Sequence, residues 1–327
     1  MIAKTLSSLS KLTITLALSL PACANEDWRE LAAQLQNLPQ AQSHSFGLHD
    51  HDGRSMDCLE VFQSGENQKI YGIYHTMRKG VFSVHLAKTT DLKNWTHLTE
   101  LDSHASQPSI HETAEGSFLV AYEKDAPNSC WIKLRHYKNL DALRQGKVNH
   151  EFEIPRSLAP TAEGTPSFES VKITDGDLSN SEIKLRFHFY QNARVDQLAS
   201  GTLKNFKDWK AAPSTKLNQQ FKSRGGKGNL GDRDRFLWKG KFYYVQEIQG
   251  AVGDWGSWGI YLCDHHGSPL QKLAIKTPKK ATAFSNPAVS WVRDSKDEKK
   301  LVFTAFLHSR GTHRSEVGQF MSVIFPK

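Results

Sequence analysis

From about residue 46 onward the chain alternates short runs of apolar and aromatic residues with polar turns. The clearest example is the stretch 231–247, G-D-R-D-R-F-L-W-K-G-K-F-Y-Y-V-Q-E, in which a turn at Gly240 separates two aromatic-rich runs. Two such runs around a glycine turn predict an antiparallel β-hairpin. Because antiparallel strands run back along each other, the charged start and the polar finish of this stretch lie at the same end of the hairpin. We expect the chemistry of the protein at that end.

The same design occurs five times along the chain. The copies begin at Met56, Gln107, Thr165, Arg233 and Asn286. Their second strands end in polar side chains, namely His75, Glu123, His188, Glu247 and His308. The starts are about 50 to 70 residues apart, and a period of this size in an all-β chain predicts a propeller of four-stranded blades. Five copies therefore predict one all-β domain over residues 46–327, a five-bladed β-propeller.

A short helical segment is expected before this domain. Residues 25–45 begin with an amphipathic stretch from Asp27 to Leu38, in which Trp28, Leu31 and Leu35 have helical spacing. We interpret it as a helix that packs on the domain and carries no chemistry of its own.

Residues 1–24 have the pattern of a secretory signal peptide. Two lysines precede an apolar run, which is followed by Ala22-Cys23-Ala24 as a small-residue cleavage site. The pattern predicts an exported protein, periplasmic or extracellular, whose mature chain starts at Asn25. The alternative is a lipoprotein that is anchored to the membrane through a lipidated Cys23.

Composition and charge narrow the choice of partners. The chain is 38% hydrophobic and 23% charged, which is typical of a soluble globular protein. Its formal net charge of +8 suits anionic surroundings such as acidic polysaccharide. The basic residues are scattered and form no stripe, so we do not expect nucleic acid as a partner. The cysteines of the mature chain, Cys58, Cys130 and Cys263, have no metal-site spacing. We therefore predict no metal and no cofactor, with calcium in a central funnel left open.

Two sequence elements resemble a known group of enzymes. These are T-T-D-L-K-N-W at residues 89–95 and the x-P-S-apolar starts of the repeats, taken together with the count of five copies. They resemble the five-bladed β-propeller glycoside hydrolases, which include the arabinanase and xylosidase family 43 and its invertase-like relatives. The resemblance implies a funnel lined by the innermost strands. It also implies an Asp of blade one as base or nucleophile, an Asp of blade two that tunes pKa values, and a Glu of blade three as general acid.

Carried over position by position, the resemblance gives two catalytic candidates and one departure. Asp57 lies at the start of the first copy and corresponds to the base. Glu163, in E-G-T-P, resembles the family's E-G-P around the acid with one residue inserted. Gln107-Pro108 stands where the family has Asp-Pro. Glutamine carries no charge, so Gln107 cannot tune the pKa values of the acid and the base.

Glycoside hydrolysis needs two carboxyl groups on either side of the bond that breaks. Asp57 and Asp234 are predicted to occupy the same register, where three of the copies have proline, so Asp234 is the candidate replacement for the missing carboxylate. Glu169 lies in an apolar strand and is the second choice for the acid. The alternative for the charged run 232–235 is a ladder of surface ion pairs.

The remaining candidates are predicted to bind substrate. Those at the repeat ends are His75, Gln107, His188, Arg233, Glu247, Asn286, His308 and Arg310. Trp255, in a glycine-rich loop with Trp258, is a candidate for stacking on a sugar ring. The histidines and arginines suit an anionic or uronate-bearing glycan.

These observations favour a secreted carbohydrate-active enzyme, a glycoside hydrolase that acts on an oligo- or polysaccharide. Two alternatives stay open. One is a propeller that binds glycan without catalysis. The other is a polysaccharide lyase, in which a His or Tyr removes the proton next to a uronate carboxylate and an Arg neutralises that group.

Overall fold

The computed structural model describes residues 27–65, 68–174, 176–190, 195–294 and 296–325. The predicted signal peptide, the Cys23 lipidation site and the start at Asn25 lie outside these ranges. None of the helices in the described part of the chain is long and apolar enough to cross a membrane.

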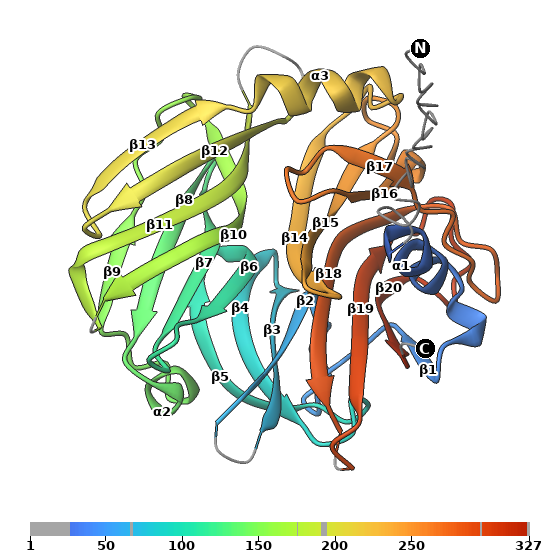
Figure 1. The fold of residues 1–327 in the computed structure, drawn as a ribbon, viewed down its shortest axis with the longest axis horizontal. Coiled ribbons are helices and arrows are strands. Elements are labelled where there is room, and N and C mark those ends of the chain that lie inside the picture. Colours follow the sequence, from blue (N-terminus) through green and yellow to red (C-terminus); the bar gives the residue numbers. More distant parts are fainter. Residues whose placement is uncertain (1–26, 66–67, 175, 191–194, 295, 326–327) are drawn as a thin grey trace, which may run out of the picture.

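The described chain is mostly β-structure, which confirms the predicted all-β class. Figure 1 shows the strands arranged around a common centre. The first group is β2 (Asp57–Ser64), β3 (Lys69–Arg78), β4 (Val81–Thr89) and β5 (Thr96–Ser103). The second is β6 (Ala105–Glu112), β7 (Phe118–Ala126), β8 (Ser129–Tyr137) and β9 (His150–Glu153). The third is β10 (Ala162–Thr174), β11 (Asp177–Tyr190), β12 (Gln197–Lys204) and β13 (Asp208–Pro213).

Two further groups complete the molecule. The fourth is β14 (Leu230–Trp238), β15 (Lys241–Gln249), β16 (Trp258–Cys263) and β17 (Pro269–Lys272). The fifth is β18 (Phe284–Arg293), β19 (Lys299–Leu307), β20 (Gly318–Ile324) and β1 (Ser43–Phe46). All five predicted hairpins are present as the first two strands of each group. A single parallel bridge, Ala162 to Cys130, joins the second and third groups into one sheet.

The first strand of each group lies nearest the centre in Figure 1. These strands also contact one another in sequence: β2 with β6, β6 with β10, β10 with β14, β14 with β18, and β18 again with β2. The apolar cores lie between neighbouring groups rather than in one central mass. One core cluster, for example, joins Leu59 and Trp95 of the first group to Val302 and Met321 of the fifth.

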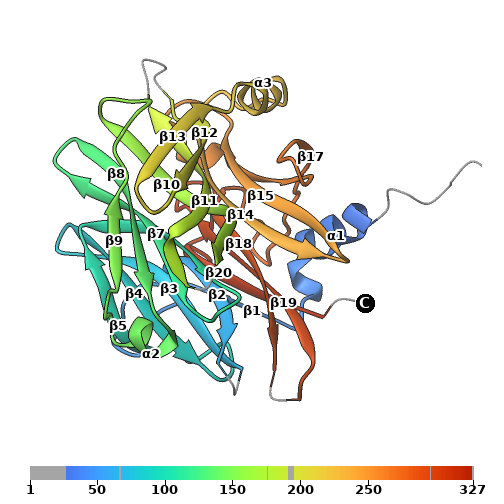
Figure 2. The ribbon, with the colours of Figure 1, turned by 60° about the vertical axis from the view of Figure 1, so that its left-hand side comes forward.

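The N-terminal segment contains the predicted helix and one strand that was not predicted. Helix α1 (Asp27–Gln36) buries Leu31 and Leu35 against the fourth and fifth groups, and Figure 2 shows it on the outside of the strands. After it, β1 pairs with β20, so that the first described strand completes the last group. The short helices α2 (Leu140–Arg144) and α3 (Thr215–Ser223) follow β8 and β13.

Each first strand contains a β-bulge at the same place. In every group two residues of the first strand lie opposite one residue of the second, at positions 58–59, 107–108, 165–166, 231–232 and 286–287. Four of the first bulge residues have left-handed backbone angles, namely Cys58, Gln107, Thr165 and Asn286, and the fifth is Gly231. A bulge redirects side chains and is frequent next to active sites.

The bulges correct the register that the sequence predicted. Pro108 and Pro166 occupy the second bulge position, and Leu59 and Asp232 are their equivalents in the first and fourth groups. Asp57 and Asp234, which we expected in the register of the prolines, therefore lie two residues before it and two residues after it. A bulge interrupts the regular alternation of side chains along a strand, so the pattern of apolar and polar residues could not reveal the error.

Candidate functional site

The bulges border a cavity of about 290 Å³ at the start of the first strands. Its lining combines carboxylates (Glu123, Asp196, Glu247), imidazoles (His188, His308), indoles (Trp255, Trp258) and smaller or amide groups (Gln107, Thr165, Asn229, Gly231, Ser285, Asn286). Six residues predicted to bind substrate lie here: Gln107, His188, Glu247, Trp255, Asn286 and His308. Four of the five predicted hairpin ends, Glu123, His188, Glu247 and His308, therefore meet at this cavity, and His75 does not line it.

None of the four predicted catalytic residues lines this cavity. Asp57 is mostly buried and accepts a hydrogen bond from Ser55 Oγ at 2.9 Å; burial raises its pKa. Glu163 is 1% exposed, and its Oε1 accepts the backbone N–H groups of residues 157–159. These three bonds give Glu163 a structural role, because they hold the loop that leads into β10.

The other two predicted carboxylates lie farther along the strands. Asp234 accepts the backbone N–H of Val289 at 2.7 Å, and burial raises its pKa to about 6. Glu169 forms an ion pair with Arg186 at 2.9 Å. Burial acts to raise the pKa of Glu169, but the hydrogen bond and charge of Arg186 outweigh it and lower the pKa overall.

Three residues predicted to bind substrate also lie outside the cavity lining. His75 is buried, and its Nδ1 accepts the N–H of Gln107 at 3.1 Å. The Arg233 side chain is buried and donates to Gln246 Oε1 and to the carbonyl of Gly231. Arg310 is exposed and pairs with Asp254 at 3.2 Å.

Polar side chains of the second strands, together with Gln319 on the third strand β20, have a structural role that the sequence did not reveal. A polar side chain of one group accepts the backbone N–H of the first bulge residue in the next group. The pairs are Gln319 with Cys58, His75 with Gln107, Glu123 with Thr165, and Glu247 with Asn286. Each bond satisfies a donor that a bulge removes from the strand ladder, and an unpaired buried donor costs about 1–3 kcal/mol.

Glu123 lies at the end of β7 with one oxygen fixed. Its Oε2 accepts the N–H of Thr165 at 3.2 Å. A Cβ at position 164 would collide with this same oxygen, so Gly164 is what allows the carboxylate to approach β10. Burial raises the pKa of Glu123, and the neighbouring His188 opposes that rise.

Glu247 lies at the end of β15 with both oxygens fixed. Its Oε1 accepts the N–H of Asp232 at 2.7 Å and its Oε2 accepts the N–H of Asn286 at 2.5 Å. Gly231 provides the room for it, as Gly164 does for Glu123. Burial raises the pKa of Glu247, while the two backbone donors, His188 and Arg233 act in the opposite direction.

An aromatic wall borders the cavity on the side of the fourth and fifth groups. The Trp255 ring is 57% exposed and lies 5.2 Å, centroid to centroid, from the His308 ring. The Trp258 ring lies 6.3 Å from His308 and is nearly parallel to it. His308 Nε2 bonds to Ser285 Oγ at 2.8 Å, and burial lowers the pKa of His308 to about 4.

Structural comparison shows which solved proteins share this fold. A structure described as a glycoside hydrolase aligns with a TM-score of 0.59 and 10% identity, over 93% of this chain and 96% of that chain. A complex of BT0996 with RGII aligns with a TM-score of 0.58 and 12% identity, over 91% and 95%. A thermostable family-43 glycoside hydrolase aligns with a TM-score of 0.54 and 11% identity, over 85% and 92%.

The chain has the same fold as these solved glycoside hydrolases. This confirms, at the level of fold, the resemblance expected from the sequence. No family model matches the sequence, and no curated protein sequence matches it.

The bulges place other residues beside the predicted catalytic candidates. The Asp-Pro position of the second group is Gln107-Pro108, and its equivalent in the first group is Cys58-Leu59. In the third group, the residue two before Pro166 is Gly164 rather than Glu163. Cys58 Sγ donates to Gln107 Oε1 at 2.5 Å, so these two positions bond to each other. The carboxylates of the cavity come instead from second strands, Glu123 and Glu247, and from a loop, Asp196.

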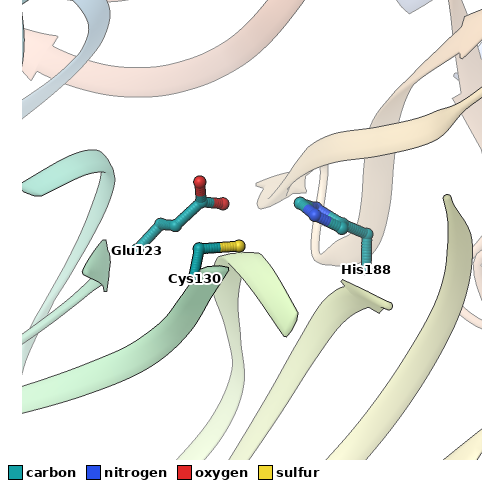
Figure 3. A group of neighbouring side chains, drawn as sticks. All are labelled: Glu123, Cys130 and His188. Carbon is teal, nitrogen blue, oxygen red and sulfur yellow. The ribbon is translucent and has the colours of Figure 1, made fainter. Parts of the chain in front are cut away.

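One cluster near the cavity joins residues that are far apart in the sequence. Glu123, Cys130 and His188 come from β7, β8 and β11, and one ligand atom of each lies within 4.8 Å of the others. Figure 3 shows the thiol of Cys130 beside the carboxylate, with the imidazole of His188 facing both. No local spacing of His and Cys announces this cluster, which is why the sequence predicted no metal site.

Proposed function

We propose that the protein is a glycoside hydrolase whose catalytic carboxyl groups are Glu123 and Glu247. The observation that carries the proposal is their position: both carboxyl groups line one cavity, at the end of the molecule where the five first strands begin. His188 also lines the cavity, and it acts to lower the pKa of both carboxyl groups against the effect of burial. Two carboxyl groups in one cavity are the minimum that glycoside hydrolysis requires.

Hydrogen bonding supports a division of roles between them. Glu247 accepts a backbone N–H on each oxygen, which favours its ionised form and suits a base or nucleophile. Glu123 accepts one backbone N–H, at Oε2, which leaves Oε1 to carry and donate a proton. We therefore assign Glu123 as the general acid.

The substrate that fits best is an uncharged glycan. The residues that line the cavity include three carboxylates and neither Lys nor Arg. An anionic sugar would find no cationic side chain to pair with there, so this lining argues against the acidic glycan expected from the net charge of the chain. It also disfavours the lyase alternative, because Arg233 is buried and Arg310 is paired with Asp254. The exposed Trp255 ring offers a face on which a sugar ring can stack.

The proposal includes the wider organisation of the protein. We take the five strand groups as the blades of a five-bladed propeller, with residues 46–327 as one domain that β1 extends to Ser43. We also keep the export of a mature chain from Asn25, with the Cys23 lipoprotein as its alternative.

The test compares single Glu→Gln variants on a panel of neutral and acidic polysaccharides, with a chelator in every assay. Glutamine keeps an oxygen that can accept a backbone N–H, and a thermal melt checks that each variant folds. We expect Glu123→Gln and Glu247→Gln to lower kcat by about 10²–10⁴-fold with glycan binding retained. Glu169→Gln is the matched control and retains full activity.

Two outcomes would change the proposal. Loss of activity in Glu163→Gln, with Glu123→Gln still active, would move the general acid to Glu163. Binding without release of reducing ends would favour the non-catalytic alternative, for which Gln107, in place of the family's Asp, is the specific support.

A further inference from the structure

We infer that Glu123, Cys130 and His188 form a binding site for a borderline-soft divalent cation of the zinc type. The first argument is distance. Zinc bonds of about 2.0–2.3 Å in a tetrahedron place neighbouring ligand atoms about 3.4–3.8 Å apart. The three ligand atoms already lie within 4.8 Å of one another, so side-chain rotations on the order of 1 Å complete the geometry.

The second argument is the kind of ligand. A thiolate, an imidazole and a carboxylate together suit zinc and its neighbours among the transition metals. Calcium and magnesium prefer sets made only of oxygen atoms, so this cluster differs from the calcium site that the sequence left open.

The third argument is the support behind the ligands. Thr165 holds two of them, because its N–H donates to Glu123 Oε2 and its Oγ1 hydrogen-bonds to His188 Nδ1. This leaves His188 Nε2 free to bind a cation, with Asp196 Oδ1 3.9 Å away. Such partners fix the orientation of metal-binding histidines and carboxylates.

The backbone of Cys130 is fixed by a hydrogen bond of its own. Its N–H donates to the carbonyl of Thr161 at 2.9 Å, at the bridge that joins the second and third groups. All three ligands are therefore set on paired strands, and Glu123 and His188 also line the cavity. Three protein ligands with a fourth position toward a cavity are typical of zinc sites that keep a place for water or Asp196.

The site has one consequence for hydrolysis, and this part rests on the proposed function. A carboxylate that binds a cation has given up its proton, so Glu123 cannot serve as a general acid while the site is filled. Zinc is therefore expected to inhibit hydrolysis reversibly, and a chelator is expected to restore it.

Binding is tested directly, without substrate. The chelator-treated protein is titrated with ZnCl₂ by calorimetry, with CaCl₂ and MgCl₂ as comparisons, and with CoCl₂ by absorbance. We expect one zinc per chain, no comparable binding of calcium or magnesium, and a near-ultraviolet band from a cobalt–thiolate bond. Cys130→Ser and His188→Ala are each expected to weaken zinc binding by about 100-fold or more and to remove the cobalt band.

The control is Cys263→Ala, which removes a buried thiol on β16 and is expected to leave zinc binding unchanged. The inference is overturned if the wild-type protein binds no zinc, if Cys130→Ser binds it as tightly, or if cobalt binds without the thiolate band. None of these results affects the hydrolysis assay, which contains chelator. Conversely, an inactive protein that binds zinc at Cys130 would contradict only the proposed function.

Discussion

Replacing His75 with glutamine is expected to make the folded protein less sensitive to acid. His75 is 5% exposed, its ring packs edge-on against Phe82, and its Nδ1 accepts the N–H of Gln107. A proton on Nδ1 would break that hydrogen bond and place a charge in a buried site. Burial, aided by nearby His85, lowers the pKa of His75 to about 3. Glutamine offers an acceptor oxygen without a titrating group.

The sign and size of the effect follow from the two pKa values. In the unfolded chain His75 takes up a proton below about pH 6.5, whereas in the folded protein it does so only near pH 3. The unfolded state therefore binds more protons between these limits, and the free energy of unfolding falls as the pH falls. One such site lowers it by about 1.4 kcal/mol at pH 5.5 and about 2.7 kcal/mol at pH 4.5.

The assay is urea unfolding, followed by tryptophan fluorescence at pH 7.5, 5.5 and 4.5 (about one unit above to about two units below the ordinary histidine pKa). His75→Gln should lose less free energy of unfolding than the wild type on acidification, by the amounts given above, with an unchanged m-value. His44→Gln is the control, because the His44 side chain is exposed on β1. If His75→Gln and the wild type lose the same free energy, burial does not suppress the charge on His75, and the reasoning fails.

Three further substitutions test the contacts between groups and the approach of Glu123. Gln319→Ala leaves the buried N–H of Cys58 without its acceptor and should lower the free energy of unfolding by about 1–3 kcal/mol in urea; no loss would mean that water replaces the amide. Gly164→Ala sets a methyl group against the Glu123 carboxylate and should reduce kcat with little change in KM, whereas an unchanged kcat would contradict the role of Glu123. Glu163→Gln should lower the thermal midpoint, because it weakens three charge-assisted hydrogen bonds, while kcat stays near that of the wild type; a stable but inactive variant would show the opposite role.

Much of the fold could be predicted because its determinants are local. A glycine turn between two aromatic-rich runs specifies a hairpin within about 20 residues of sequence. The T-T-D-L-K-N-W element behaves as its composition predicts: Trp95 is 2% exposed, and Asp91 accepts the N–H groups of Lys93 and Asn94. Burial acts to raise the pKa of Asp91, yet these bonds lower it to about 2. The strand β1 escaped prediction because its pairing with β20 joins the two ends of the described chain.

The site could be predicted only in part. The polar residues at the ends of the second strands meet at one cavity because the repeat places them at equivalent positions, and Glu247, His188 and His308 were found in this way. Asp196 lies in a connection between strands and carries no signal from the repeat. The thiol of Cys130 also escaped notice, since only the packing of the second group against the third brings it to His188.

The choice among carboxylates depends on a different feature, the position of the bulge. The resemblance directs attention to the first strands, where Asp57, Glu163 and Asp234 are the acidic residues nearest to the repeat starts. All three are mostly buried, and each accepts hydrogen bonds within the protein. Whether these side chains reach the cavity depends on their positions relative to the bulge. In the two copies that lack proline, the sequence does not show where the bulge falls.

The two carboxylates that we propose instead, Glu123 and Glu247, also take part in the contacts between neighbouring groups. Glu123 and Glu247 each accept a bulge N–H from the next group, so the contact that joins neighbouring groups also fixes a carboxyl group at the cavity. Such a carboxyl group is held to one position by backbone atoms of two groups, which is the preorganisation that catalysis needs. Deleting the side chain would therefore confuse loss of chemistry with loss of packing, whereas glutamine keeps an acceptor and removes only the acid. The proposed catalytic carboxylates lie on second strands, whereas the resemblance to the family pointed to first strands. Gly164 and Gly231 leave the space that these two carboxylates occupy.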